Sequence, residues 1–202
     1  KNYSKQIEIN NEPIEYSSSN FSNTKKNVLI IGNSLSEDLF MMFQLNKDLF
    51  KNYEFKFFRM HLSNFLENKK DKKKIDFFKQ HQLFKDSDII LISSNFRKYG
   101  RYSKDIDSLS NIKNLVNKYS KQLILTSNSP QFESIINPVE DITFKFKINK
   151  KDNNQFINEK VYQLINKREY KKNQKIFDFA TTNNLIILDK MKIFCTKEIK
   201  VC

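Results

Sequence analysis

Asn27-Val28-Leu29-Ile30-Ile31-Gly32-Asn33-Ser34 opens with a short apolar run and then reaches a glycine, one of only two in the chain. An uninterrupted apolar run of this length is typical of a parallel strand buried on both faces. A helical pattern follows, with apolar positions between Glu37 and Phe50. The stretch therefore predicts a buried strand, a tight turn at Gly32 and a helix.

The alternation of strand and helix continues along the chain. We expect further strands at 53–60, 88–93, 122–127 and 185–188, and helices at 72–84, 106–119 and 158–180. The segment 142–148 is ambiguous between the two. Short apolar strands that alternate with helices predict a doubly wound α/β fold. We expect a flavodoxin-like three-layer α/β/α sandwich around a five-stranded parallel sheet.

The polar N-terminal segment, residues 1–26, contains Ser17-Ser18-Ser19-Asn20 and predicts a linker or an N-terminal arm. The remainder, 27–202, predicts one domain. Its two cysteines, Cys195 and Cys202, have a spacing that matches no common zinc pattern. A disulfide and two unrelated thiols both remain open on spacing alone.

The formal net charge of the chain is +13. Such an excess favours a polyanionic partner, for example nucleic acid, an acidic membrane face or an acidic glycan. Compositional bias toward Lys, Asn, Ile and Phe is the favoured explanation, because the lysines are spread over the whole length, and we expect no nucleic-acid partner. No apolar stretch reaches the length of about 18 residues that a membrane span needs.

Polar residues follow the predicted strands. Ser34 comes after the first strand, Ser94 and Asn95 after the third, Asn128 after the fourth, and Asp189 after the fifth. Ligands bind outside the carboxyl ends of the strands in sheets of this type. We therefore expect these side chains to converge on one rim, with Asn33, Ser94 and Asn128 contacting a substrate.

Ser34 lies two residues beyond Gly32, where a glycine permits a tight turn. A hydroxyl at the start of a helix suits a nucleophile, because the helix N-terminus favours developing negative charge. Ser34 or Ser36 could instead cap the helix with support from Glu37. Phosphate binding is a third interpretation, although the usual glycine-rich motifs are absent. These residues alone leave the three open.

The stretch from Val28 to Ser36 resembles the first block of the SGNH/GDSL hydrolases, a hydrophobic strand followed by G-[DN]-S-x-[ST]. It looks most like the SGNH domains fused to acyltransferase-3 membrane proteins. Their block commonly reads G-D-S-H, so Asn33 and Leu35 are departures. The segment 88–93 with Asn95 is placed like the third block, whose Asn helps to form the oxyanion hole.

The later segments are similar to the same family. Leu123 to Ser127 with Pro130 is similar to the fourth strand. Leu188-Asp189 with the two cysteines resembles the late segment of the acyltransferase-3 type, in which a cysteine pair often precedes the final catalytic block. The resemblance thus implies a disulfide between Cys195 and Cys202.

Two parts of the family pattern are missing. The loop after the second strand, near Met60 to Asn64, lacks the glycine that donates a backbone N–H to the oxyanion. The final D-x-x-H, which supplies the base and its carboxylate, is also absent, because Phe58 and Phe78 stand three residues before His61 and His81. Either the chain is truncated at its C-terminus and this block lies beyond Cys202, or the domain has lost its base. We expect both histidines to be solvated or packed against helices.

The resemblance implies a serine esterase or O-acetyltransferase with Ser34 as nucleophile and Asn95 in the oxyanion hole. The implied substrate is an acyl ester, most often acetyl, of cell-surface carbohydrate. No metal or nucleotide cofactor is implied. We expect a monomeric domain outside the cytoplasmic membrane, tethered to a membrane acyltransferase domain. A glycan-binding module on the same fold and a basic nucleic-acid-binding domain are the alternatives.

Overall fold

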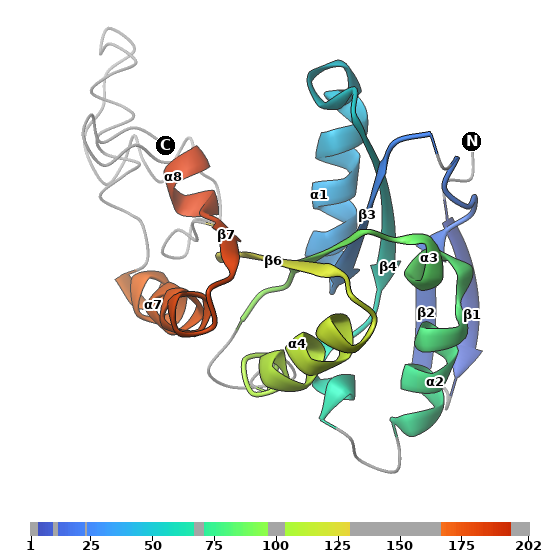
Figure 1. The fold of residues 1–202 in the computed structure, drawn as a ribbon. Coiled ribbons are helices and arrows are strands. Elements are labelled where there is room, and N and C mark those ends of the chain that lie inside the picture. The colour runs from blue at the N-terminus through green and yellow to red at the C-terminus, as the bar shows by residue number, and fades with distance from the viewer. Residues whose placement is uncertain are drawn as a thin grey trace, which may run out of the picture.

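The protein is described by a computed structural model that covers residues 4–9, 12–22, 24–66, 71–96, 104–129 and 167–194. Its centre is a sheet of seven strands in the order β1-β2-β4-β3-β5-β6-β7 (Figure 1). The strands are β1 (Ser4–Ile9), β2 (Glu12–Ser17), β3 (Lys26–Gly32), β4 (Tyr53–Arg59), β5 (Ile89–Ser93), β6 (Gln122–Thr126) and β7 (Ile186–Leu188).

The five strands from β3 onward confirm the predicted parallel sheet. Each neighbouring pair among them runs parallel. Numbered along the chain, these five strands lie in the order 2-1-3-4-5, which is the flavodoxin-like arrangement. The fold class predicted from the sequence is therefore present.

The prediction of a linker over 1–26 is wrong for most of that segment. β1 and β2 pair as an antiparallel hairpin, and β2 continues the sheet by pairing with the end of β4. Ile14 of β2 is 2% exposed, and Ile7, Ile9 and Tyr16 pack against the same core. Polar and apolar side chains alternate in these strands because only one face of the hairpin is covered.

Helices cover both faces of the sheet. They are α1 (Ser34–Leu45), α2 (Lys72–Gln80), α3 (Gln82–Asp86), α4 (Leu109–Lys118), α7 (Lys167–Thr182) and α8 (Lys190–Phe194), with the 3-10 turns η1 (Lys47–Phe50) and η2 (Leu62–Phe65). In the described parts of the chain, no helix is long and apolar enough to cross a membrane.

The core is divided by the sheet into two clusters. Val28 and Ile30 of β3 face α1, whereas Leu29 and Ile31 face the layer built from α2, α3, α4 and α7. This alternation follows from the two-residue period of a strand, and it explains why β3 reads as continuously apolar. β3 is thereby fixed in the middle of the molecule, and its end positions the candidate site.

Several predicted boundaries shift. The predicted helix over 72–84 divides at His81, whose extended backbone separates α2 from α3. The helix expected from Glu37 begins at Ser34 and ends at Leu45, and η1 follows it. Residues 142–148, the first part of 158–180 and both cysteines lie outside the described residues, as does the proposed disulfide.

Candidate active site

The candidate site lies where the strand order reverses, between β3 and β5. Gly32 at the end of β3 pairs with Ser93 at the end of β5. Ser34 and Asn95 therefore each come two residues after a paired position on adjacent strands, which lie about 4.8 Å apart in a sheet. Both residues therefore follow neighbouring strand ends, at the point where open α/β sheets bind ligands, and their shared role in a site stays a prediction.

Gly32 allows this close approach of the two chains. A Cβ at this position would lie 1.8 Å from the backbone oxygen of Ser93, and the backbone has φ +157°. No other residue fits against β5 there without moving the strand. The glycine therefore sets both the end of β3 and the turn that carries Ser34.

Asn33 is the N-cap of α1, whereas the sequence had predicted Ser34 or Ser36 as possible caps. Its side-chain oxygen accepts the N–H of Leu35 at 3.0 Å, and Asn33 is 5% exposed. Ser36 is fully buried, with its hydroxyl donating to the backbone oxygen of Asn33 at 2.7 Å. Neither serine caps α1, and Glu37 instead lies 3.8 Å from Arg59.

Ser34 remains exposed at the first position of α1. Among the described residues, its hydroxyl has no hydrogen-bond partner. The N–H groups of Leu35 and Ser36 are both taken by Asn33, the second at 2.9 Å. The N–H of Ser34 itself has no such partner in the described structure, so it is free to bind an oxyanion at the positive end of the helix.

A buried polar network supports this turn from behind. Asn33 donates its side-chain N–H to the hydroxyl of Ser94 at 3.2 Å, and Ser94 donates in turn to a carboxylate oxygen of Asp105 at 2.5 Å. The other carboxylate oxygen of Asp105 accepts the backbone N–H of Ser63 at 3.2 Å. The network links the ends of β3 and β5 to the loop after β4.

Asp105 is the charged member of this network and is fully buried. Burial raises its pKa to about 6, although the hydrogen bonds from Ser94 and Ser63 act in the opposite direction. Sequence reasoning missed Asp105 completely. It precedes α4 without any local signal, because its partners come from segments far away in the chain.

The three residues expected to contact substrate are buried, and their side chains form hydrogen bonds within the protein. Asn33 and Ser94 belong to the network described above. Asn128 is 1% exposed, and its side chain accepts the N–H of Phe96 at 2.9 Å and donates to the oxygen of Phe96 at 3.1 Å. The direct-contact prediction is corrected for all three, because their hydrogen-bonding groups are used to hold the loops after β3, β5 and β6.

Asn95 lies on the loop held by Asn128 and is 8% exposed. Its neighbour Phe96 is fully buried and fixed at both backbone groups by Asn128. Asn128 is itself fixed, since its N–H donates to the side-chain oxygen of Asn173 on α7 at 2.8 Å. Asn95 is thus carried by a rigid loop next to the Ser34 turn.

Three backbone N–H groups of the loop after β4 are used in hydrogen bonds within the protein. The N–H of Met60 donates to the backbone oxygen of Gly32 at 2.7 Å, and that of Asn64 donates to His61 at 3.1 Å. The N–H of Ser63 is taken by Asp105. These three groups are therefore structural.

The two histidines differ in position. His81 is packed as expected: its ring meets Tyr16 edge-on at 4.5 Å, and its Nδ1 accepts the N–H of Leu83. Burial lowers the pKa of His81. His61 follows directly on Met60 and is half-buried at the carboxyl edge of the sheet.

The end of β7 completes the rim. Asp189 caps α8, accepting the N–H of Met191 at 3.0 Å, and also receives the hydroxyl of Ser127 at 3.3 Å. The neighbouring Lys190 is 5% exposed, and burial lowers its pKa to about 8 against an opposing effect of Asp38. The described residues contain no group of three His, Cys, Asp or Glu side chains placed to hold a metal ion.

Comparison with known proteins gives matches only at the level of structure. No protein-family model and no curated protein matches the chain. A GDSL-like lipase from Bacteroides thetaiotaomicron is similar in fold, with 15% identity, a TM-score of 0.49 and coverage of 90% of this chain and 77% of that one.

Two further solved structures are similar to the same degree. A putative acylhydrolase from Bacteroides fragilis has 16% identity, a TM-score of 0.48 and coverage of 90% of this chain and 76% of its own. An acetyl xylan esterase has 13% identity, a TM-score of 0.48 and coverage of 83% and 78%. At these levels of identity the likeness concerns the fold.

Proposed function

We propose that this chain is a serine-dependent acyl-ester hydrolase or acyl-transfer domain with Ser34 as its nucleophile. One observation carries the proposal: Ser34 is exposed at the first position of α1, while Asn33 performs the capping role. A serine at a helix start is ordinarily explained as a cap. Here that explanation is removed, and the hydroxyl stands at the switch point of the sheet.

The geometry suits addition to an ester carbonyl. The Ser34 oxygen forms a bond to the carbonyl carbon, and the oxyanion that develops is bound by the Ser34 N–H and the Asn95 side-chain amide. The bond to the alcohol oxygen then breaks, leaving an acyl-serine, and the proton lost by Ser34 passes to the departing alcohol through a general base. Water or an acceptor hydroxyl releases the acyl group in the second half-reaction.

The general base is proposed from the resemblance alone. The resemblance of the Gly32-Asn33-Ser34 block implies an Asp–His pair beyond Cys202. It also implies acetyl esters of cell-surface carbohydrate as substrates and a location outside the cytoplasmic membrane. An exposed serine at a helix start is accessible to a bulky carbohydrate ester.

Labelling with a fluorophosphonate probe tests the proposal. In the full-length natural protein we expect one covalent adduct, which peptide mapping assigns to Ser34. Ser34→Ala should abolish the adduct. Ser36→Ala is the matched control and should leave the adduct in place, because Ser36 is fully buried on the same helix. Hydrolysis of p-nitrophenyl acetate should follow the same order.

Absence of labelling in a folded full-length protein would overturn the proposal. Binding of a glycan without labelling would then assign the rim to a carbohydrate-binding module. Retention on nucleic acid at physiological salt would assign the positive charge to nucleic-acid binding instead. His61→Ala tests the one histidine near the carboxyl edge among the described residues: unchanged hydrolysis would exclude His61 as the base, and a loss of hydrolysis would assign that role to it.

A further inference from the structure

The edge of the sheet opposite the candidate site carries an exposed apolar surface. Leu45 and Leu49 are 81% and 79% exposed, and Met41 and Tyr53 are 39% and 41% exposed. These four residues, here called the apolar tip, come from the end of α1, from η1 and from the first residue of β4. Apolar side chains gathered in this way usually mark an interaction site.

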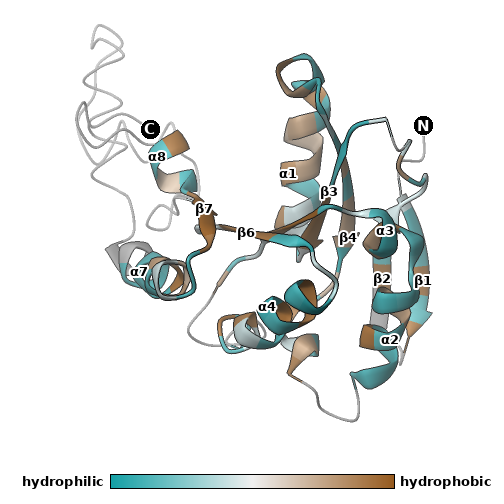
Figure 2. Ribbon diagram, in the orientation of Figure 1, coloured by the Kyte–Doolittle hydropathy of each residue, from teal (hydrophilic) through white to brown (hydrophobic). Residues whose placement is uncertain are grey.

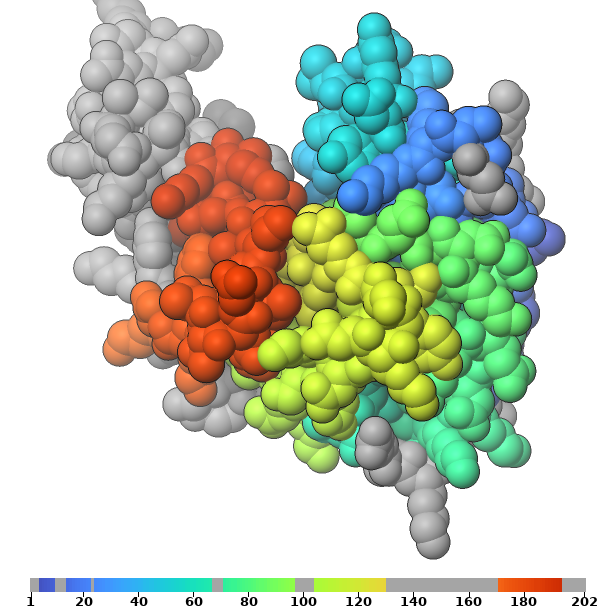
Figure 3. Space-filling view, viewed as in Figure 1, coloured from blue at the N-terminus to red at the C-terminus, as the bar shows by residue number. Residues whose placement is uncertain are grey.

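The apolar tip projects from the body of the molecule. Figure 3 shows the end of α1 and the residues after it as a knob at the top of the space-filling view. Figure 2 shows that apolar residues continue along α1 into this end. The exposed leucines therefore lie on a protruding part of the surface.

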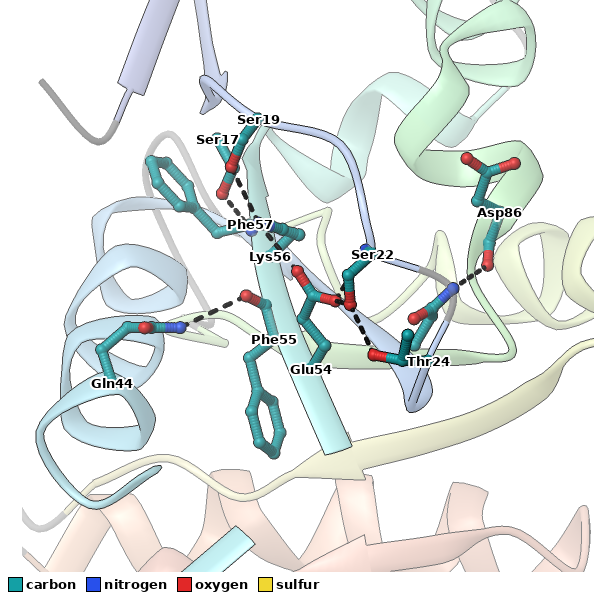
Figure 4. A network of polar contacts seen from close by, with 11 residues as sticks. Ser17, Ser19, Ser22, Thr24, Gln44, Glu54, Phe55, Lys56, Phe57 and Asp86 are labelled. Carbon is teal, nitrogen blue, oxygen red and sulfur yellow. Dashed lines mark hydrogen bonds and ion pairs between the residues drawn. The ribbon is translucent and has the colours of Figure 1, made fainter. Parts of the chain in front are cut away.

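The leucines of the tip stay exposed because packed aromatic rings beneath them, here called the aromatic platform, fix the end of α1 and η1. The ring of Phe43 stacks on that of Phe55 with centroids 4.1 Å apart, and Phe50 meets Phe43 edge-on at 5.0 Å. Gln44 also donates to the backbone oxygen of Phe55 at 3.4 Å (Figure 4). The leucines therefore point outward from a rigid base.

Three exposed lysines lie near the apolar tip, two within or next to η1 and one lining the adjacent hollow. Lys25, Lys47 and Lys51 are exposed and form no ion pair with any described residue. Lys25 and Lys47 also line a hollow of about 240 Å³ beside Phe50 and Tyr53. Two free ammonium groups at the mouth of a hollow suit a phosphate group.

The carboxylate in the same hollow does not cancel this charge. Glu54 accepts from both the N–H and the hydroxyl of Ser22, at 2.8 and 2.6 Å, and pairs with Lys56 at 3.0 Å (Figure 4). Burial would raise the pKa of Glu54, but these contacts outweigh it and hold the pKa below its usual value. Asp48 of η1 is an exposed acid next to the leucines, and the described residues near the tip include three exposed lysines.

We propose that the apolar tip docks on a bilayer surface rich in anionic lipid. Leu45 and Leu49 enter the boundary between headgroups and acyl chains, and the three lysines contact lipid phosphates. Exposed apolar side chains enter the lipid boundary, and nearby lysines attract anionic headgroups. Together these two features bind anionic membrane surfaces. A protein partner would have to present a matching apolar cavity with an acidic rim.

Docking in this way orients the candidate site. Ser34 and Leu45 are the first and last residues of α1, so they lie about 16 Å apart along the helix axis at 1.5 Å per residue. With Leu45 at the lipid boundary, Ser34 faces the aqueous side. The tip is thus an anchor, and the substrate is reached from solution.

A single tryptophan tests the docking directly, because the chain has none. Leu49→Trp should show a blue-shifted emission on addition of vesicles of phosphatidylglycerol and phosphatidylcholine, and no shift with phosphatidylcholine alone. Tyr119→Trp is the matched control, since Tyr119 is 43% exposed on another part of the surface. It should show no shift with either vesicle.

Sedimentation with the same vesicles measures the contribution of each part. Leu45→Ser with Leu49→Ser should weaken binding at least tenfold, while Ile193→Ser, at a residue 55% exposed on α8, should not. Lys47→Gln with Lys51→Gln should also weaken it. The control is Lys72→Gln with Lys73→Gln, which removes the same charge from α2.

Three results would overturn the proposal. Equal binding by the leucine variants would show that charge alone attracts the protein to lipid. Unshifted emission of Leu49→Trp would show that the tip stays in water. Concentration-dependent self-association that the leucine variants abolish would make a second copy the occupant. None of these results depends on labelling of Ser34.

Discussion

The two edges of the sheet use side chains in opposite ways. At the carboxyl edge, polar residues such as Asn33, Ser94 and Asp105 are buried and bonded to one another, and the Ser34 hydroxyl is left exposed. At the amino edge, Leu45 and Leu49 are exposed above an aromatic platform. Buried polar groups need partners inside the protein, and exposed apolar groups gain nothing from folding, so each edge departs from the ordinary division of polar and apolar residues.

Among substitutions at the two edges, we expect Gly32→Ala to lower the free energy of unfolding most. The new Cβ would overlap the Ser93 oxygen, so β3 and β5 would have to separate at the site. We expect a loss of at least about 3 kcal/mol in the free energy of unfolding, measured by urea denaturation. Ser34→Ala, two residues away and exposed, should change that free energy by less than about 0.5 kcal/mol. Similar losses for both would contradict the close packing of the two strands.

The pH dependence of stability should identify Asp105. Its pKa is about 6 in the folded protein against 3.8 for an ordinary aspartate, so folding favours its protonated form. This contribution is fully present below pH 3.8 and is lost as the pH rises through 6. A shift of about two units corresponds to about 3 kcal/mol.

Asp105→Asn isolates this contribution from that of other carboxylates. The difference in unfolding free energy between wild type and variant should change between pH 4 and 7, with wild type losing stability relative to the variant as the pH rises. A difference that stays constant over this range would mean that Asp105 is not buried in the way described.

The sequence predicted the strands that form this carboxyl edge but not the hydrogen bonds between its side chains. The apolar run 27–31 and the alternation of strands with helices were sufficient for the parallel sheet and for the placement of Ser34. The roles of Asn33, Ser94 and Asn128 were not, because which polar side chain bonds to which loop depends on tertiary approach. Asp105 lies beyond any local pattern for the same reason.

The hairpin of β1 and β2 was missed for a different reason. Ile7 and Ile9 alternate with polar residues, as do Ile14 and Tyr16, and two asparagines separate the strands in the sequence. This alternation is a strand signal. The serine-rich run that follows led to the prediction of a linker for the whole segment.

Ser94→Ala should lower the free energy of unfolding by less than Gly32→Ala does. Removal of this hydroxyl leaves an oxygen of Asp105 and the side-chain N–H of Asn33 without their present partner in a buried site. We expect a loss of about 2 kcal/mol by thermal or urea unfolding. Ser87→Ala is the comparison at the amino edge, where a buried serine makes one bond to the oxygen of Phe84, and should cost less. An equal cost would mean that the network contributes nothing beyond one ordinary hydrogen bond.

Substitutions at the apolar tip should change the free energy of unfolding least. Leu45→Ala should leave the free energy of unfolding within about 0.5 kcal/mol of wild type, because a side chain 81% exposed loses almost no packing. Leu39→Ala, on the same helix but 7% exposed, should cost about 2–5 kcal/mol. If Leu45→Ala destabilised the protein as much as Leu39→Ala, the tip would be part of the core, and its exposure would no longer require a partner. A neutral result with weakened vesicle binding would show instead that Leu45 is retained for an interaction outside the folded chain.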